Sequence, residues 1–226
     1  MEYPTVARSQ LLARIADGDL RALLRGAPER SFKARQVLFQ RGDEPDGLYV
    51  IASGRVRVAI AAPDGDDLTL ATFGPGEVLG ELSALDRTPR SATAVADLPT
   101  KALFITTHQF QSWVTGHPPV AWILLAELAR RLRATNEQVA EIALLDAETR
   151  VARRLWQWFC EASEGAARSG ARLQVSQRQM ASMLGVSRES VNKQLARLRA
   201  GGVVTMEGGE LVLLRPEALR VSAEAP

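Results

Sequence analysis

The sequence is poor in the residues on which disulfides, metal sites and membrane segments depend. Among 226 residues there is one cysteine, Cys160, and there are two histidines, His108 and His117. A single cysteine excludes an internal disulfide and any four-cysteine zinc or iron–sulfur site built by one chain. No run approaches the roughly 18–20 apolar residues of a membrane span, and residues 1–20 do not read as a signal peptide. We therefore expect a cytoplasmic protein with no metal, no prosthetic group and no membrane partner.

Features of a catalytic site are also scarce. The sequence contains no G-x-x-x-x-G-K-[ST] phosphate loop, no cluster of metal ligands and no nucleophile with an obvious base. Both histidines fall in one loop-like region, which leaves little for acid–base chemistry. The sequence therefore does not predict an enzyme.

Length and charge point to two domains of different character. A chain of 226 residues, 46% of them hydrophobic, is long enough for two separate cores. From Ala147 onward there are 12 basic and 8 acidic residues, whereas residues 1–146 contain 16 basic and 18 acidic residues. By itself, an excess of basic over acidic residues more often marks a solvated surface than a nucleic-acid-binding site. Charge alone therefore does not predict DNA binding.

Hydrophobic patterning predicts helices first and then short strands. Residues 8–26 have helical spacing, in one or two short helices. From Ser31 to about Thr107, apolar segments alternate with turn residues, as expected for a sandwich or barrel. The clearest strands are Tyr49–Ile51 and Val56–Ile60. The turns between strands are marked by Gly42, Gly47, Gly54 and Asp64-Gly65.

A long helix is predicted from about Pro119 to Leu145. Apolar residues recur on it at alternating steps of three and four, which is the seam of a dimeric coiled coil. The seam consists of Leu125, Leu128, Leu132, Thr135, Val139 and Ile142. A helix that packs only on its own domain is the alternative. Thr135 is polar, so we expect it to have a hydrogen-bonding partner within the seam.

A helix-turn-helix is predicted at Ser176–Arg199. Ser176 followed by Gln179 is a capping box, Gly185 suits the turn, and Ser187 caps a second helix that ends at Gly201-Gly202. On the second helix an apolar stripe opposes polar residues that suit base edges. The predicted DNA-reading residues are Ser187, Arg188, Glu189, Asn192 and Lys193, and the predicted phosphate contacts include Arg178 and Arg197. After this helix, Val203–Met206 and Leu211–Leu214 form a predicted hairpin around Gly208-Gly209.

A candidate ligand site lies in the run Gly74–Val95. Gly80 allows close approach of the backbone, and Leu82 and Leu85 are expected to anchor a short helix whose amides face an anion. Glu81 suits a sugar hydroxyl, and Arg90 with Ser91 suits a phosphate. An ordinary structural Glu–Arg ion pair explains the same spacing equally well.

These motifs together resemble the cyclic AMP receptor/FNR superfamily of transcription regulators. Gly80-Glu81-Leu82-Ser83-Ala84-Leu85 with Pro89-Arg90-Ser91-Ala92 is similar to its phosphate-binding cassette. Ala129-Arg130-Arg131-Leu132 resembles its dimer helix, and Ser187-Arg188-Glu189 its recognition helix. The resemblance implies an α+β fold with a jelly-roll-like double-stranded β-roll (1–117), a dimerisation helix (118–146) and a winged helix-turn-helix (147–226).

The resemblance also implies roles and partners. The ligand would be a cyclic nucleotide, cyclic AMP by preference and cyclic GMP as an option. It would be bound by Gly80, Glu81, Leu82, Ser83, Arg90, Ser91, Ala92, Arg131 and Thr135, and by Asn136 of the partner protomer. The implied partners are a second copy of the chain, a palindromic duplex with TGTGA-like half-sites, and RNA polymerase.

Three positions depart from the family pattern and leave alternatives open. Asn136 stands where the family's cyclic AMP receptors have serine, and Gln177 and Lys193 stand where they have arginines directed at DNA. Arginine and lysine are not equivalent at a bidentate contact, so Lys193 is assigned to guanine or to phosphate. The rival interpretations are a regulator with another effector, such as cyclic di-GMP, or with none, and a nucleotide-binding signalling protein without DNA activity.

Overall fold

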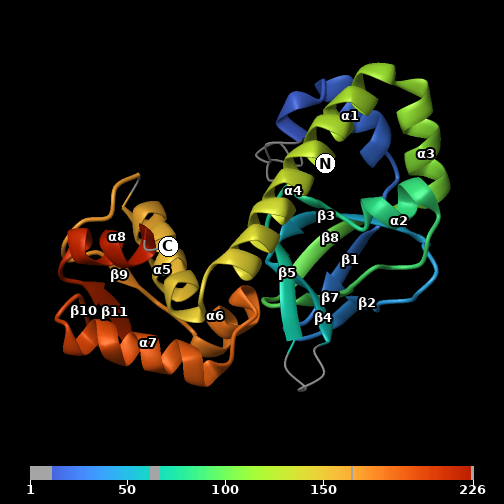
Figure 1. Ribbon diagram of the computed structural model, residues 1–226. Coiled ribbons are helices and arrows are strands. Elements are labelled where there is room, and N and C mark those ends of the chain that lie inside the picture. The colour runs from blue at the N-terminus through green and yellow to red at the C-terminus, as the bar shows by residue number, and fades with distance from the viewer. Residues whose placement is uncertain (1–11, 62–66, 164, 225–226) are drawn as a thin grey trace. The chain divides into compact units, whose positions relative to one another are not determined.

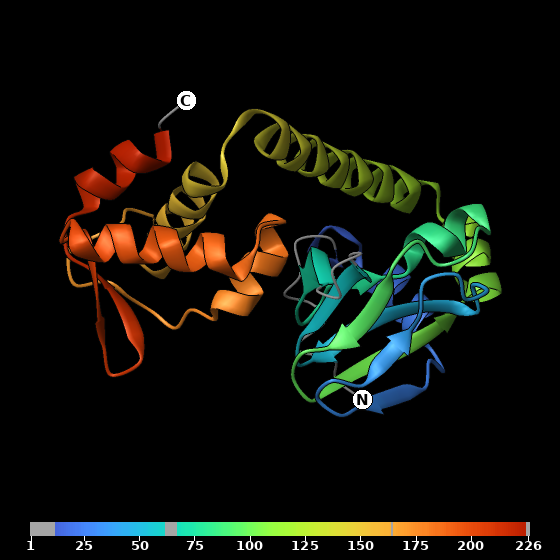
Figure 2. The same cartoon turned by 60° about the horizontal axis from the view of Figure 1, so that its bottom comes forward.

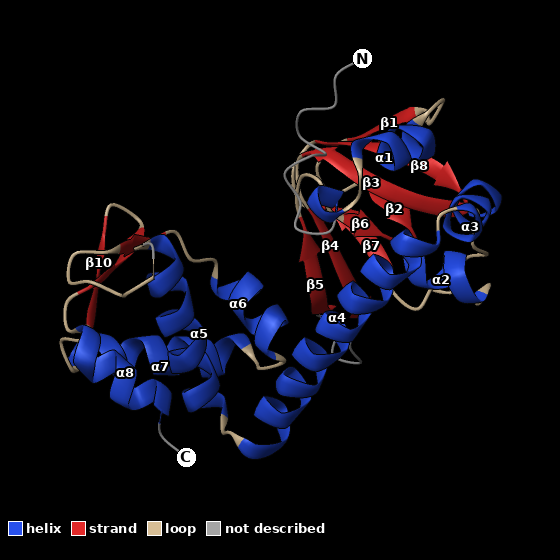
Figure 3. Ribbon diagram, turned by 90° about the horizontal axis from the view of Figure 1, so that it is seen from above, coloured by secondary structure: helices blue, strands red, loops and turns tan. Residues whose placement is uncertain are grey.

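The computed structural model describes residues 12–61, 67–163 and 165–224, and it divides into two compact units, Met1–Arg133 and Ala134–Pro226 (Figure 1). The turn predicted at Asp64-Gly65 and the first part of the helical stretch predicted at 8–26 lie outside the described residues. Strands dominate the first unit and helices the second (Figure 3).

The first unit contains two antiparallel four-stranded sheets, with strand orders β1-β8-β3-β6 and β2-β7-β4-β5. The strands are β1 (Glu29–Phe32), β2 (Val37–Phe39), β3 (Gly47–Ser53), β4 (Val56–Ala61), β5 (Asp67–Phe73), β6 (Val78–Leu79), β7 (Thr93–Ala96) and β8 (Thr100–Thr106). This arrangement confirms the predicted double-sheet β-roll.

Strand β3 contributes side chains to two separate hydrophobic cores, one on each face of its sheet. Successive side chains of a strand point to opposite faces. Leu48 and Val50 therefore pack under the helices, whereas Tyr49 and Ile51 pack between the two sheets. All four are buried, which accounts for a continuous apolar run where a half-exposed strand would alternate.

Helices cover the outer face of the first sheet. They are the 3-10 turn η2 (Leu12–Arg14), α1 (Asp17–Leu24), α2 (Glu81–Asp86), α3 (Thr107–Gly116) and the start of α4 (Pro118–Leu144). The expectation that Leu82 and Leu85 anchor α2 is wrong. Both are exposed, Leu82 by 51%, and Ala84 is the fully buried apolar residue of this helix. In a helix this short, only the Glu81, Ser83 and Ala84 face reaches the protein interior.

The second unit is a winged helix-turn-helix with its own apolar core. Its elements are α5 (Ala147–Ala162), β9 (Arg172–Leu173), α6 (Gln177–Leu184), α7 (Arg188–Ala200), β10 (Val204–Glu207), β11 (Glu210–Leu213) and α8 (Pro216–Glu224). The β10–β11 hairpin projects from the helices of this unit (Figure 2). Its turn glycines, Gly208 and Gly209, both have positive φ, as predicted for a tight two-residue turn. The short strand β9, which pairs with β11, was not predicted.

The predicted caps of the helix-turn-helix are present. Ser176 Oγ accepts from Gln179 N at 3.4 Å, and Ser187 Oγ accepts from Ser190 N at 3.1 Å. Gly185 ends α6 in the left-handed conformation, at φ +60°. The two helices and the turn between them therefore follow from local sequence.

Among the described residues, no helix combines the length and the apolar character needed to cross a bilayer. The same residues contain no group of three or more His, Cys, Asp or Glu side chains placed to hold a metal ion.

Candidate ligand and DNA-binding sites

Gly80 joins β6 to α2 in a conformation that favours glycine. Its φ is +84°, and a Cβ built on it would lie 2.7 Å from Nη1 of Arg90. The guanidinium of Arg90 occupies the space that a side chain would need, and Nη1 donates to the Gly80 carbonyl at 2.9 Å. Gly80 is thus required both by the backbone and by the close approach of Arg90.

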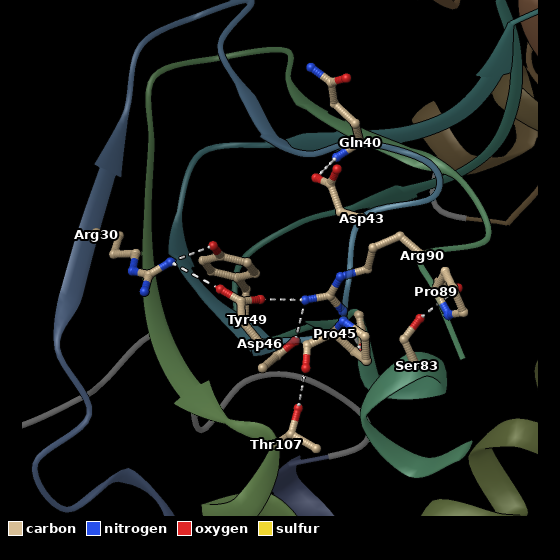
Figure 4. Close-up of polar contacts among 12 residues, drawn as sticks. Arg30, Gln40, Asp43, Pro45, Asp46, Tyr49, Ser83, Pro89, Arg90 and Thr107 are labelled. Atoms are coloured by element: carbon tan, nitrogen blue, oxygen red, sulfur yellow. Dashed lines mark hydrogen bonds and ion pairs between the residues drawn. The ribbon is translucent and has the colours of Figure 1, made fainter. Parts of the chain in front are cut away.

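Arg90 is buried at the centre of a polar cage (Figure 4). Its side chain is 1% exposed, and Nη2 donates to Oδ1 of Asp46 at 2.9 Å and to the carbonyl of Gly47. The guanidinium also stacks over the ring of Phe39, 4.3 Å from its centroid. These contacts fix the position and the plane of the arginine.

Within the described part of the chain, one nitrogen of this guanidinium, Nε, is unsatisfied. The buried Nε of Arg90 has no hydrogen-bond partner among the described residues. A buried unsatisfied donor is costly, so an acceptor from a bound molecule would stabilise this Nε–H. Together with the glycine at position 80, this donor makes Arg90 the leading candidate for a ligand-binding residue.

Asp46 is a site residue that the sequence did not predict. It lies 44 positions before Arg90, and the dipeptide Asp46-Gly47 by itself predicts only a turn. Its second oxygen is 3.9 Å from Nη1 of Arg30, which in turn donates to the hydroxyl of Tyr49 at 2.8 Å (Figure 4). Asp46 therefore orients Arg90 from the side of the sheet.

Glu81 is buried beside the start of the cassette and pairs with α4. It is 6% exposed, and Oε1 accepts from Nη1 of Arg131 at 2.7 Å. Arg131 also donates to the Val78 carbonyl at 3.2 Å and to Glu127 at 2.9 Å. Burial raises the pKa of the Glu81 carboxyl, and the charge of Arg131 opposes that rise. The structure thus brings together three of the predicted ligand-site side chains, Glu81 and Arg131 in one pair and Arg90 across Gly80.

The other predicted ligand residues are distributed differently. Ser83 is buried and its hydroxyl donates to the Pro89 carbonyl at 3.5 Å, whereas Ser91 is exposed. Ala92 is buried. Thr135 and Asn136 belong to the second unit, so their place at the base stays a prediction.

The recognition helix α7 separates a buried face from an exposed one. Val191, Leu195 and Leu198 are buried in the core of the second unit. The predicted DNA-reading residues lie on the exposed face: Ser187, Arg188, Glu189, Asn192, Lys193 and Arg197. Gln177 and Arg178 on α6 are also exposed. Ser187 has a structural task as well, since its hydroxyl caps the helix.

Comparisons with known proteins agree with this division. Residues 29–117 match the cyclic nucleotide-binding domain, and residues 149–221 match the Crp-like helix-turn-helix domain. The chain is 32% identical over 218 residues to the CRP-like cAMP-activated global transcriptional regulator of Mycobacterium tuberculosis, covering 95% of this chain and 96% of that one. It is 34% identical over 180 residues to the cyclic AMP receptor protein of Thermus thermophilus, covering 80% and 81%. The solved structure of the c-di-GMP responsive global regulator CLP of Xanthomonas campestris superposes with a TM-score of 0.77 at 25% identity, covering 88% and 99%.

Proposed function

This chain belongs to the cyclic AMP receptor/FNR family of transcription regulators. We propose that it binds a cyclic nucleotide in its first unit and that this binding sets its affinity for DNA. The observation that carries the proposal is Arg90, a buried guanidinium held by Asp46 and Gly47 whose Nε has no partner among the described residues. In this proposal Ser91 would add a hydroxyl donor to the phosphate, and Glu81 would accept from the ribose. Gly80, Leu82, Ser83 and Ala92 shape the cassette around these groups.

Cyclic AMP is the effector that we favour. The relatives from M. tuberculosis and T. thermophilus are named for cyclic AMP. Thr135 and the partner's Asn136 would meet the base, and cyclic GMP is the closest competitor. A second candidate is cyclic di-GMP, because the similar X. campestris structure is described as responsive to it.

The DNA-binding form is a dimer in this proposal. Four apolar residues of the α4 seam are exposed in the single chain: Leu125, Leu132, Val139 and Ile142. Pairing of two such helices would bury them and would place two α7 helices about one DNA turn, roughly 34 Å, apart. Arg188, Glu189 and Asn192 would read bases and Arg178 and Arg197 would contact phosphates. The duplex partner implies the cytoplasm, and RNA polymerase is the expected further partner.

The second unit contains contacts suited to carry the signal from α4 to the recognition helix. Glu141, near the end of α4, pairs with Arg153 of α5 at 3.4 Å. Arg150 of α5 donates to the carbonyl of Leu184 at 2.8 Å, next to the turn of the helix-turn-helix. A shift of the α4 pair would therefore move α5 and the reading helix together. By thermodynamic reciprocity, DNA would tighten nucleotide binding by the same factor.

Calorimetry with cyclic AMP, cyclic GMP and cyclic di-GMP on purified protein tests the ligand. We expect cyclic AMP to bind most tightly, and Arg90→Lys, which keeps the charge but loses the fork, to bind it at least tenfold more weakly. Arg87→Lys is the matched control, because Arg87 is exposed in the same cassette and contacts Gln111. Equal binding by wild type and Arg90→Lys would overturn the assignment of this site.

A further inference from the structure

Glu148, in the first turn of α5, reaches two basic side chains of the recognition helix. One carboxylate oxygen is 3.6 Å from Nζ of Lys193, and the other is ion-paired with Nη1 of Arg197. Lys193 and Arg197 are four residues apart and therefore lie on the same face of α7. A single acid is thus shared by two of the cations that are predicted to meet DNA.

The ion pairs lie at the protein surface. The side chain of Glu148 is 33% exposed, and those of Lys193 and Arg197 are more exposed than that. Asp146, two residues earlier, also interacts electrostatically with Arg197. The pKa of its carboxyl is lowered, first by its hydrogen bonds with Thr149 and to a smaller extent by Arg150 and Arg197. The start of α5 therefore places negative charge against the basic side of the reading helix.

We propose that Glu148 limits the affinity of this protein for DNA by competing with backbone phosphates for Lys193 and Arg197. The inference rests on the proposed DNA-binding function. With Glu148 in place, the three groups carry a net charge of +1, whereas the two cations alone carry +2. A phosphate that binds either cation must share it or compete for it with the carboxylate, which stays close to the polyanion. For each phosphate that the protein neutralises less because of Glu148, the slope of log affinity against log salt falls by about 0.9.

The test compares Glu148→Gln with Glu161→Gln, which removes the same charge from the exposed far end of the same helix. Full-length protein is titrated into a labelled duplex of about 30 base pairs of arbitrary sequence, three DNA turns, over a range of salt concentrations. We expect Glu148→Gln to bind at least threefold more tightly at low salt, with a salt slope steeper by about one per protomer. Glu161→Gln should match wild type in both.

A double-mutant cycle separates competition from a general change in charge or stability. In the Arg197→Gln background, the effect of Glu148→Gln on affinity should shrink by half or more, because the main ion pair is already gone. Wild-type affinity and slope for Glu148→Gln, or weaker binding than wild type, would overturn the competition and leave DNA binding itself intact. Failure of wild type to bind any duplex, with or without cyclic nucleotide, would instead overturn the proposed function.

Discussion

Replacement of Gly80 by alanine tests the geometry of the ligand site most sharply. The new Cβ would lie 2.7 Å from Nη1 of Arg90 and 3.5 Å from its Cζ, so the guanidinium must move. The backbone would also have to keep φ +84° with a side chain attached. Both effects act on the single cage that we assign to the cyclic phosphate.

The expected cost has two parts. The left-handed conformation costs a non-glycine residue about 1–2 kcal/mol, and loss of a charged hydrogen bond to the Gly80 carbonyl costs about 1.5–3 kcal/mol. We therefore expect Gly80→Ala to lose about 3 kcal/mol in the free energy of unfolding. Because Arg90 is displaced, cyclic AMP should bind at least about tenfold more weakly, which corresponds to about 1.4 kcal/mol.

Gly26→Ala is the matched control. Gly26 has φ +74°, and nothing lies within 4 Å of the position that its Cβ would take, so only the backbone cost applies. Urea unfolding followed by circular dichroism gives the stabilities, and calorimetry gives the affinity for cyclic AMP. Equal loss of stability in the two variants, or wild-type affinity in Gly80→Ala, would refute the assigned role of the Gly80–Arg90 contact.

Three further predictions concern other parts of the chain. Burial raises the pKa of Glu81 above its usual 4.5, so its contribution to stability is fully present below that pH and is lost as pH rises through the raised pKa. As pH rises from 4.5, the free energy of unfolding of Glu81→Gln should therefore increase relative to that of wild type. A difference between the two proteins that does not change with pH would contradict this. Asp146 caps α5 by accepting from Thr149 N at 2.7 Å, so Asp146→Ala should cost about 1 kcal/mol in urea unfolding and Asp146→Asn much less. Leu132 is 61% exposed on the α4 seam, so Leu132→Glu should convert the dimer to monomer in sedimentation, and an unchanged dimer would refute the seam.

Local spacing was sufficient to predict much of this fold. The caps at Ser176 and Ser187 and the glycine turn at Gly185 depend on residues within four positions of one another, and they appear where the sequence places them. The long helix was predicted within one residue at each end, because its period continues over many turns. The α2 helix was predicted with the wrong residues buried, since six residues do not define an apolar face.

Contacts between distant positions were not accessible in the same way. Asp46 orients Arg90 across 44 positions, and Glu148 reaches Arg197 across 49. Nothing in the residues around Asp46 or Glu148 signals such a partner, because each becomes a neighbour only through the packing of separate elements. The sequence therefore predicted the elements that local spacing defines better than the contacts that join distant side chains.

DNA affinity measured with and without cyclic nucleotide tests the central claim most directly. Fluorescence anisotropy of a labelled palindromic duplex with TGTGA half-sites would be recorded with no effector, with cyclic AMP and with cyclic GMP at one salt concentration. We predict that cyclic AMP tightens binding by about fivefold or more, the lower range of typical allosteric coupling. Equal affinity in all three conditions would contradict the account, because the site at Arg90 would then have no effect on the helix that reads DNA.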